Sequence, residues 1–154
     1  MRRIPDPEPG RRNRNRKDDG VEEKRKQACP EVRVPADQVE RFMAAALEKV
    51  GVPPADAAIC AETLIAADLR GIDSHGINRL EPIYIDRIRQ GTQTAVTRVE
   101  VVRDGPTATV IDGHNGMGLV IGRQAMAITL QKAKKLGMAM TAVRNSNHYG
   151  IAGF

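Results

Sequence analysis

The sequence is poor in aromatic residues and cysteines, and it has no long apolar run. It contains no Trp, two Tyr and two Phe in 154 residues, so a core must rest on aliphatic and Met side chains. Two cysteines, Cys29 and Cys60, do not make a disulfide framework, and we expect free thiols in a reducing compartment, the cytoplasm. No apolar run approaches the roughly 20 residues that cross a membrane, so we expect a soluble protein.

The positive charge is concentrated at the N-terminal end. Residues 1–26 hold ten Lys or Arg and six Asp or Glu, which is +4 of the net charge of +5 and leaves +1 for residues 27–154. Because the first residues are also poor in apolar side chains, we expect residues 1–30 to form a disordered basic tail. Short basic runs are common in solvated tails, so nucleic-acid binding through this tail is only an alternative.

Apolar spacing and terminal glycines predict helices over residues 35–50, 54–70 and 73–90. Asp73 or Ser74 should cap the third helix, and Pro82 should kink or break it, because proline removes a backbone hydrogen bond and clashes one turn back. The pattern then predicts a hairpin, a helix and a buried strand, over residues 97–102 with 107–112, 119–136 and 138–143. The fold class is therefore α+β, in which a helical region precedes an incomplete mixed sheet.

A glycine-rich loop, residues 113–118, follows the predicted hairpin and opens the next helix, as a phosphate-binding loop would. Its glycines miss the spacing of the dinucleotide fingerprint, and no Asp or Glu follows Asp112 to hold a ribose. The preceding strands also resemble a hairpin and not a parallel unit. We interpret the loop as a tight connection between strand and helix.

His148 is the first candidate for chemistry. It lies in a polar loop after the last predicted strand, flanked by Asn145, Ser146 and Asn147, which can orient an imidazole. Gly150 allows a backbone or ligand to come close. A single loop histidine is more often structural, but histidine exchanges protons near neutral pH, and this setting favours a general acid or base.

His75 and Arg79 are the second candidate, because four residues separate them at the start of the third predicted helix. Backbone N–H groups at a helix start attract anions, and an arginine fork suits a carboxylate. The alternative is a capped surface helix in which Arg79 pairs with Asp73 or Asp86. The three histidines share no ligand spacing, so we predict no metal site, and Cys60 should have a packing role.

Two motifs carry a family resemblance: DSHGINRL at residues 73–80 and RNSNHYG at residues 144–150. In this order they resemble the malate/L-lactate dehydrogenase family of the second type, which includes sulfolactate and ureidoglycolate dehydrogenases and is unrelated to the Rossmann-fold enzymes. The resemblance covers roughly residues 34–154. It implies a non-Rossmann dehydrogenase fold, of which residues 31–154 would be an incomplete N-terminal part.

The resemblance implies reversible hydride transfer between NAD or NADP and the C2 atom of a small 2-hydroxy acid. His148 would be the acid/base, Arg79 would bind the substrate carboxylate, and His75 would belong to the substrate site with Ser74 as support. The family usually carries a tyrosine on the same helix, for which Tyr84 is the candidate in a register that Pro82 leaves open. The cofactor-binding residues stay unknown, and the family implies a homodimer for a full-length chain.

The chain ends shortly after His148, and a site needs walls on all sides. We therefore expect this chain alone to be an inactive, truncated part of an enzyme. The alternative is a non-catalytic dimerisation or interaction module. A reading frame that stays open beyond Phe154 would favour the enzyme.

Overall fold

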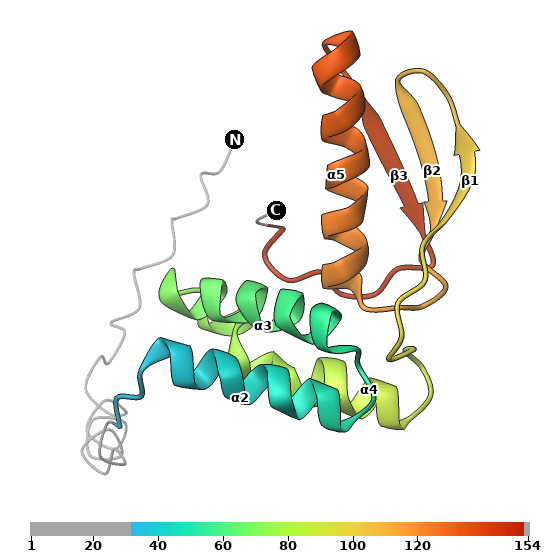
Figure 1. Cartoon of the computed structure of the whole chain (residues 1–154). Helices are drawn as coiled ribbons and strands as arrows, with labels where there is room; N and C mark the ends of the chain where they lie inside the picture. The colour runs from blue at the N-terminus through green and yellow to red at the C-terminus, as the bar shows by residue number, and fades with distance from the viewer. Residues whose placement is uncertain (1–31, 153–154) are drawn as a thin grey trace, which may run out of the picture. The chain divides into compact units, whose positions relative to one another are not determined.

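The structure, a computed structural model, describes residues 32–152 (Figure 1). The chain divides into two compact units, residues 1–33 and 34–154, and the second holds all helices and strands of the described part. The disordered tail predicted for residues 1–30 lies outside the described residues. The second unit has the predicted α+β class, with helices followed by a three-stranded mixed sheet.

Helices α2 (Ala36–Lys49) and α3 (Pro54–Leu69) pack side by side, as the predicted αα-hairpin requires. Gly51 follows α2 with a φ of 92°, a left-handed conformation that glycine adopts without steric cost. Pro54 is the first residue of α3, where a missing N–H breaks no intrahelical bond. The first two predicted helices are thus confirmed to within about one residue at each end.

The predicted third helix is wrong in its first half. Two short 3₁₀ turns, Asp73–His75 and Ile77–Arg79, come first, and neither has a side-chain cap. A π-helical turn, η3 (Leu80–Ile85), and a short helix, α4 (Asp86–Arg89), follow. The predicted break at Pro82 is confirmed, because the proline lies inside the π turn, where the regular α-helical pattern of hydrogen bonds is lost.

The sheet has the order β1-β2-β3 (Figure 1). Strands β1 (Glu100–Asp104) and β2 (Ala108–Asp112) form the predicted antiparallel hairpin, and β3 (Met140–Arg144) pairs with β2 in parallel. Helix α5 (Gly118–Leu136) connects the last two strands, and Gly137 ends it with a φ of 82°. The first strand begins three residues later than the predicted residue 97, because Thr97 instead accepts a hydrogen bond from the backbone of Met117.

Strand β3 was predicted to be buried, and this prediction is wrong. Met140 is 61% exposed, and only one of the five residues of the strand is even partly buried. The strand lies at an edge of the sheet, where it pairs with β2 and packs against α5. Its apolar composition therefore reflects a sheet surface that no residue among 32–152 covers.

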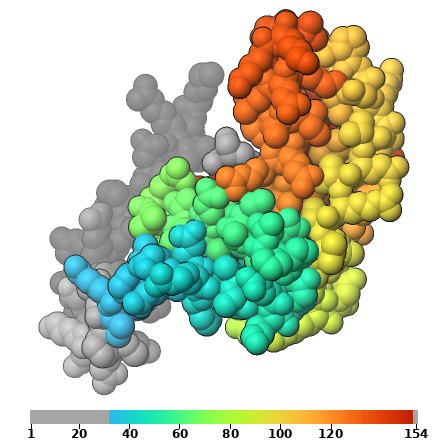
Figure 2. Space-filling model, viewed as in Figure 1, coloured from blue at the N-terminus to red at the C-terminus, as the bar shows by residue number. Residues whose placement is uncertain are grey.

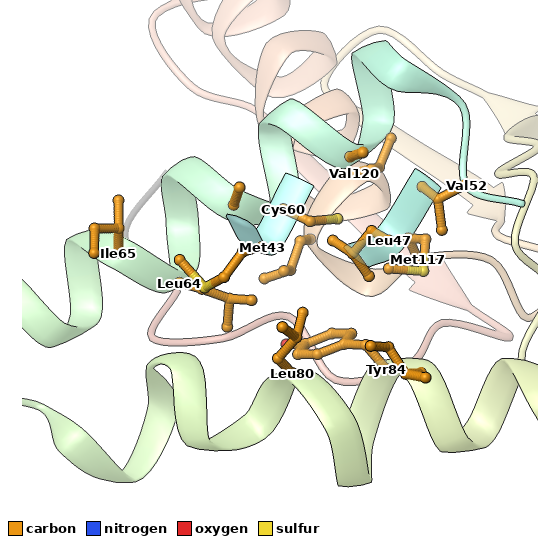
Figure 3. Packing of buried hydrophobic residues seen from close by; sticks show 14 residues of the cluster. Met43, Leu47, Val52, Cys60, Leu64, Ile65, Leu80, Tyr84, Met117 and Val120 are labelled. Carbon is orange, nitrogen blue, oxygen red and sulfur yellow. The ribbon is translucent and has the colours of Figure 1, made fainter. Parts of the chain in front are cut away.

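The main core joins the helical layer to the start of α5. Met43, Leu47, Leu64 and Tyr84 are fully buried and pack with Val120 of α5 (Figure 3). A second, smaller cluster lies between α5 and the sheet and consists of Ile111, Ile121 and Ala125. The space-filling view shows that the helices and the start of α5 meet without a gap (Figure 2). Among the helices of residues 32–152, none has the length and hydrophobicity needed to cross a membrane.

Substitutions on α2 test this core. Leu47→Ala removes a fully buried side chain and should lower the free energy of unfolding by about 2–5 kcal/mol. Phe42→Ala, a matched control on the same helix where the side chain is 61% exposed, should change it by no more than about 0.5 kcal/mol. Chemical denaturation of the chain measures both. Equal losses would mean that α2 buries a different face.

Candidate functional site

His148 contacts both layers of the fold. Its loop follows β3, and its Nδ1 atom lies 2.9 Å from the hydroxyl oxygen of Tyr84 on η3. The backbone N–H of Gly150 donates to the same nitrogen over 3.2 Å. The rings of Tyr84 and His148 meet edge to face, with centroids 6.0 Å apart. The histidine ring is therefore fixed by a residue 64 positions earlier in the chain and by its own loop.

The contacts of Nδ1 bear on the protonation of the ring. An N–H group can only donate, so the Gly150 contact favours the neutral form in which Nδ1 accepts and Nε2 carries the proton. Burial, followed by the nearby charges of His75, Arg79 and Arg87, lowers the pKa of His148 below its ordinary value. Burial also raises the pKa of Tyr84, so its phenol keeps its proton and can donate or accept.

His75 stacks on His148. The ring centroids are 5.4 Å apart, and the ring planes differ by 25°. The Ser74 hydroxyl lies 2.8 Å from Nδ1 of His75, so Ser74 orients this ring. The prediction that Asp73 or Ser74 caps a helix is wrong, because no side chain caps the first 3₁₀ turn. Arg79 Nε donates to the backbone oxygen of Ser74 over 2.5 Å, which folds the guanidinium back over the first 3₁₀ turn. The two terminal nitrogens of Arg79 have no hydrogen-bond partner among residues 32–152.

Asp68 at the end of α3 holds this segment in place. Its Oδ2 atom accepts the backbone N–H of Ile77 over 2.8 Å. A Cβ atom on Gly76 would lie 1.6 Å from Asp68 Oδ1, so any other residue here would displace this carboxylate. The backbone between the two 3₁₀ turns is thus bonded to Asp68, and these turns stand in place of the regular helix that the sequence predicted.

An open hollow of about 590 Å³ lies beside these rings. It is lined by Ile72, His75, His148, Tyr149, Gly150, Ile151 and Ala152. His75 and His148 thus line the same hollow, and the Ser74 hydroxyl contacts the His75 ring. Arg79 does not line the hollow in this conformation. A neutral imidazole with a guanidinium nearby suits an anionic substrate that exchanges a proton.

The sequence pattern indicated Tyr84 only as a candidate and gave no sign of Asp68 or Arg87. Tyr84 lies two residues after Pro82 in the same π turn, and its side chain is buried in the core (Figure 3). Nothing in the local sequence marks Asp68 as the residue that organises a loop nine positions away. Cys60 has the predicted packing role: burial raises the pKa of its thiol to about 12.

The glycine-rich loop is closed to phosphate. The strands before the loop, β1 and β2, form the predicted hairpin, and β2 also pairs in parallel with β3, which follows α5. A Cβ on Gly118 at the start of α5 would lie 2.3 Å from the carbonyl oxygen of Asn147 and 2.4 Å from that of His148. The loop that carries His148 therefore covers the N-terminus of α5, where a phosphate would otherwise bind.

Comparison with known proteins identifies the family. A sequence model described as malate/L-lactate dehydrogenase matches residues 34–154. Malate dehydrogenase from Pyrococcus abyssi is 47% identical over 123 residues, which cover 80% of this chain and 34% of that protein. L-Sulfolactate dehydrogenase from Methanocaldococcus jannaschii is 44% identical over 108 residues, which cover 70% and 31%.

A solved structure shares the fold. Malate dehydrogenase from Pyrococcus horikoshii superimposes with a TM-score of 0.76 at 45% identity, over 79% of this chain and 35% of that one. The chain spans about a third of the length of the relatives that it matches. By its sequence and its fold, the chain belongs to the malate/L-lactate dehydrogenase family.

Proposed function

We propose that residues 34–154 supply the acid/base and carboxylate-binding part of a nicotinamide-dependent dehydrogenase of small 2-hydroxy acids. One observation supports this most strongly: the ring of His148 is held between Tyr84, Gly150 and His75 at the edge of an open hollow. A positioned imidazole of lowered pKa can exchange a proton near neutral pH. The oxidoreductase class follows from the family.

His148 would move the proton of the substrate hydroxyl. To accept it, Nε2 must be unprotonated, which requires the ring proton to lie on Nδ1. Tyr84 permits this change, because its hydroxyl can accept from Nδ1 as well as donate to it. The Gly150 N–H disfavours a proton on Nδ1, because it donates to that nitrogen. Tyr84 would therefore be the contact that holds the ring whether or not Nδ1 carries a proton. In reduction the same nitrogen would return the proton to the forming alkoxide.

Arg79 would bind the substrate carboxylate. Its Nε is engaged by Ser74, and its two terminal nitrogens remain available as a fork for two carboxylate oxygens. His75, stacked on His148 and oriented by Ser74, would form the wall between carboxylate and hydroxyl. A 2-hydroxy acid carries both groups on adjacent carbons, which suits a site with a cation next to an acid/base.

The cofactor would be NAD or NADP, because hydride removed from a 2-hydroxy acid needs an acceptor. The glycine-rich loop does not fit it, since the loop of His148 covers the start of α5. No described residue is assigned to the cofactor. The cytoplasm as location and a homodimer as assembly are also proposals, which rest on the buried free Cys60 and on the family respectively.

Two experiments test the proposed function, one on the chain alone and one on a chimera. The chain alone should bind neither NADH nor NADPH with a saturable fluorescence change and should not reduce 2-oxo acids. A chimera of the Pyrococcus horikoshii malate dehydrogenase, in which residues 34–154 of this chain replace the matching segment, should turn over a 2-oxo acid. A chimera that folds like its parent but does not turn over would contradict the proposed function.

The non-catalytic alternative has one observation in its favour. Leu130 on α5 and Met140 on β3 are 51% and 61% exposed, which leaves apolar surface available for association. A stable dimer of the chain, combined with a folded but inactive chimera, would support an interaction module. Turnover by the chimera would favour the enzyme.

His148→Asn in the active chimera should lower turnover about 10²- to 10⁴-fold, the usual contribution of a positioned acid/base. Asparagine keeps a polar side chain but cannot exchange a proton near neutral pH. The control is His114→Asn, because the His114 ring does not line the hollow and bonds Glu100 over 3.0 Å. If the His148 variant keeps its turnover, His148 is not the acid/base, and His75 becomes the next candidate.

Arg79→Lys in the same chimera should lower kcat/KM for the 2-oxo acid markedly, mainly through KM. Lysine keeps the charge but loses the planar fork that binds two carboxylate oxygens. Arg123→Lys serves as the control, since Arg123 pairs with Glu62 on the surface over 2.6 Å. An unchanged KM in the Arg79 variant would restrict Arg79 to its bond with Ser74.

A further inference from the structure

Asp112 is a buried carboxylate outside the catalytic contacts. It ends β2, is only 4% exposed, and begins the glycine-rich loop. Three groups donate to it: the backbone N–H of His114 over 2.9 Å, the Asn145 amide over 3.0 Å and Arg144 Nε over 2.8 Å. These donors lower the pKa of Asp112 to about 2, so it is ionised at working pH.

The partners of Asp112 belong to the loop that carries His148. Asn145 has a φ of 51°, an unfavourable conformation for a residue with a side chain, and its amide contacts both oxygens of Asp112. The backbone N–H of Gly113 donates to the Arg144 carbonyl over 3.0 Å, and that of Asn115 donates to the Asn145 carbonyl over 2.8 Å. The two loops are therefore joined at their first residues.

The same two loops are also joined close to the histidine. The Asn147 amide donates to the carbonyl oxygens of Asn115 and Gly116 over 2.9 and 3.1 Å. The backbone of His148 then lies directly on Gly118, where no Cβ fits. The glycine-rich loop thus serves as a backbone cradle for the loop of His148.

We infer that Asp112 is a positioning residue for His148, because its buried carboxylate fixes Asn145 and Arg144 and so sets where the next residues place the imidazole. The importance of this placement for turnover rests on the proposed function. The placement itself can be measured in the chain alone. The groups that face His148 are Tyr84, His75, Arg79 and Arg87, and none of them belongs to the Asp112 cluster.

Proton NMR of the three histidine rings over pH tests the inference in the folded chain. Asp112→Asn keeps the size of the side chain but sets an amide NH2 against the donors from Asn145 and Arg144. The loop should then loosen and His148 should become more exposed. We expect its pKa to rise towards the ordinary value of about 6.5.

Asp104→Asn is the matched control. Asp104 is also a strand aspartate, paired with Lys132 and bonded to Thr109, but it contacts no residue of the His148 loop. Its loss should affect stability and leave the titration of His148 unchanged. An equal rise in both variants would overturn the inference, because it would reflect general loosening of the fold.

Asn145→Gly keeps the inference testable if Asp112→Asn does not fold. Glycine accepts the φ of 51°, so the backbone is preserved and only the amide that binds Asp112 is lost. Asn115→Gly, at a φ of 57°, removes a side chain that has no hydrogen-bond partner among residues 32–152 and is its control. The inference requires a raised pKa of His148 in the first variant only. A folded Asn145→Gly chain with the wild-type titration would overturn it, whether or not the enzyme proposal holds.

Discussion

The hydrogen bond between Tyr84 and Nδ1 of His148 is the interaction on which the site depends. It connects a π turn of the helical layer to a loop at the end of the sheet, across 64 positions of sequence. Neither partner is placed by local structure alone. Tyr84 is fully buried in the main core, and His148 is held by a loop that rests on the start of α5. The site therefore forms only when both layers pack correctly.

Two carboxylates organise the segments on either side of this bond. Asp68 bends the segment of His75 and Arg79 by binding the backbone of Ile77, and Asp112 ties down the loop of His148. Each accepts hydrogen bonds from backbone or side-chain donors of a bent, irregular segment. Irregular backbone at this site is thus stabilised by acceptors from regular elements, namely the end of α3 and the end of β2.

The sequence predicted those features that depend on local patterns. Helical spacing located α2, α3 and α5, and a turn signal located the hairpin. The motif around His148 predicted a polar loop after a strand, and this loop is present. The regular helix predicted after Asp73 was wrong, because two 3₁₀ turns form there and the backbone of Ile77 bonds Asp68, which lies outside the motif. The burial of β3 was wrong because apolar composition alone does not reveal whether a sheet face is covered.

The most direct test of this account is ¹⁵N NMR of the ring of His148 near neutral pH. The account predicts that Nδ1 is a hydrogen-bonded acceptor, that Nε2 carries the proton, and that Tyr84→Phe shifts the Nδ1 resonance because its hydroxyl contact is lost. Ring nitrogens that show the averaged shifts of a solvent-exposed histidine, unchanged by Tyr84→Phe, would contradict it.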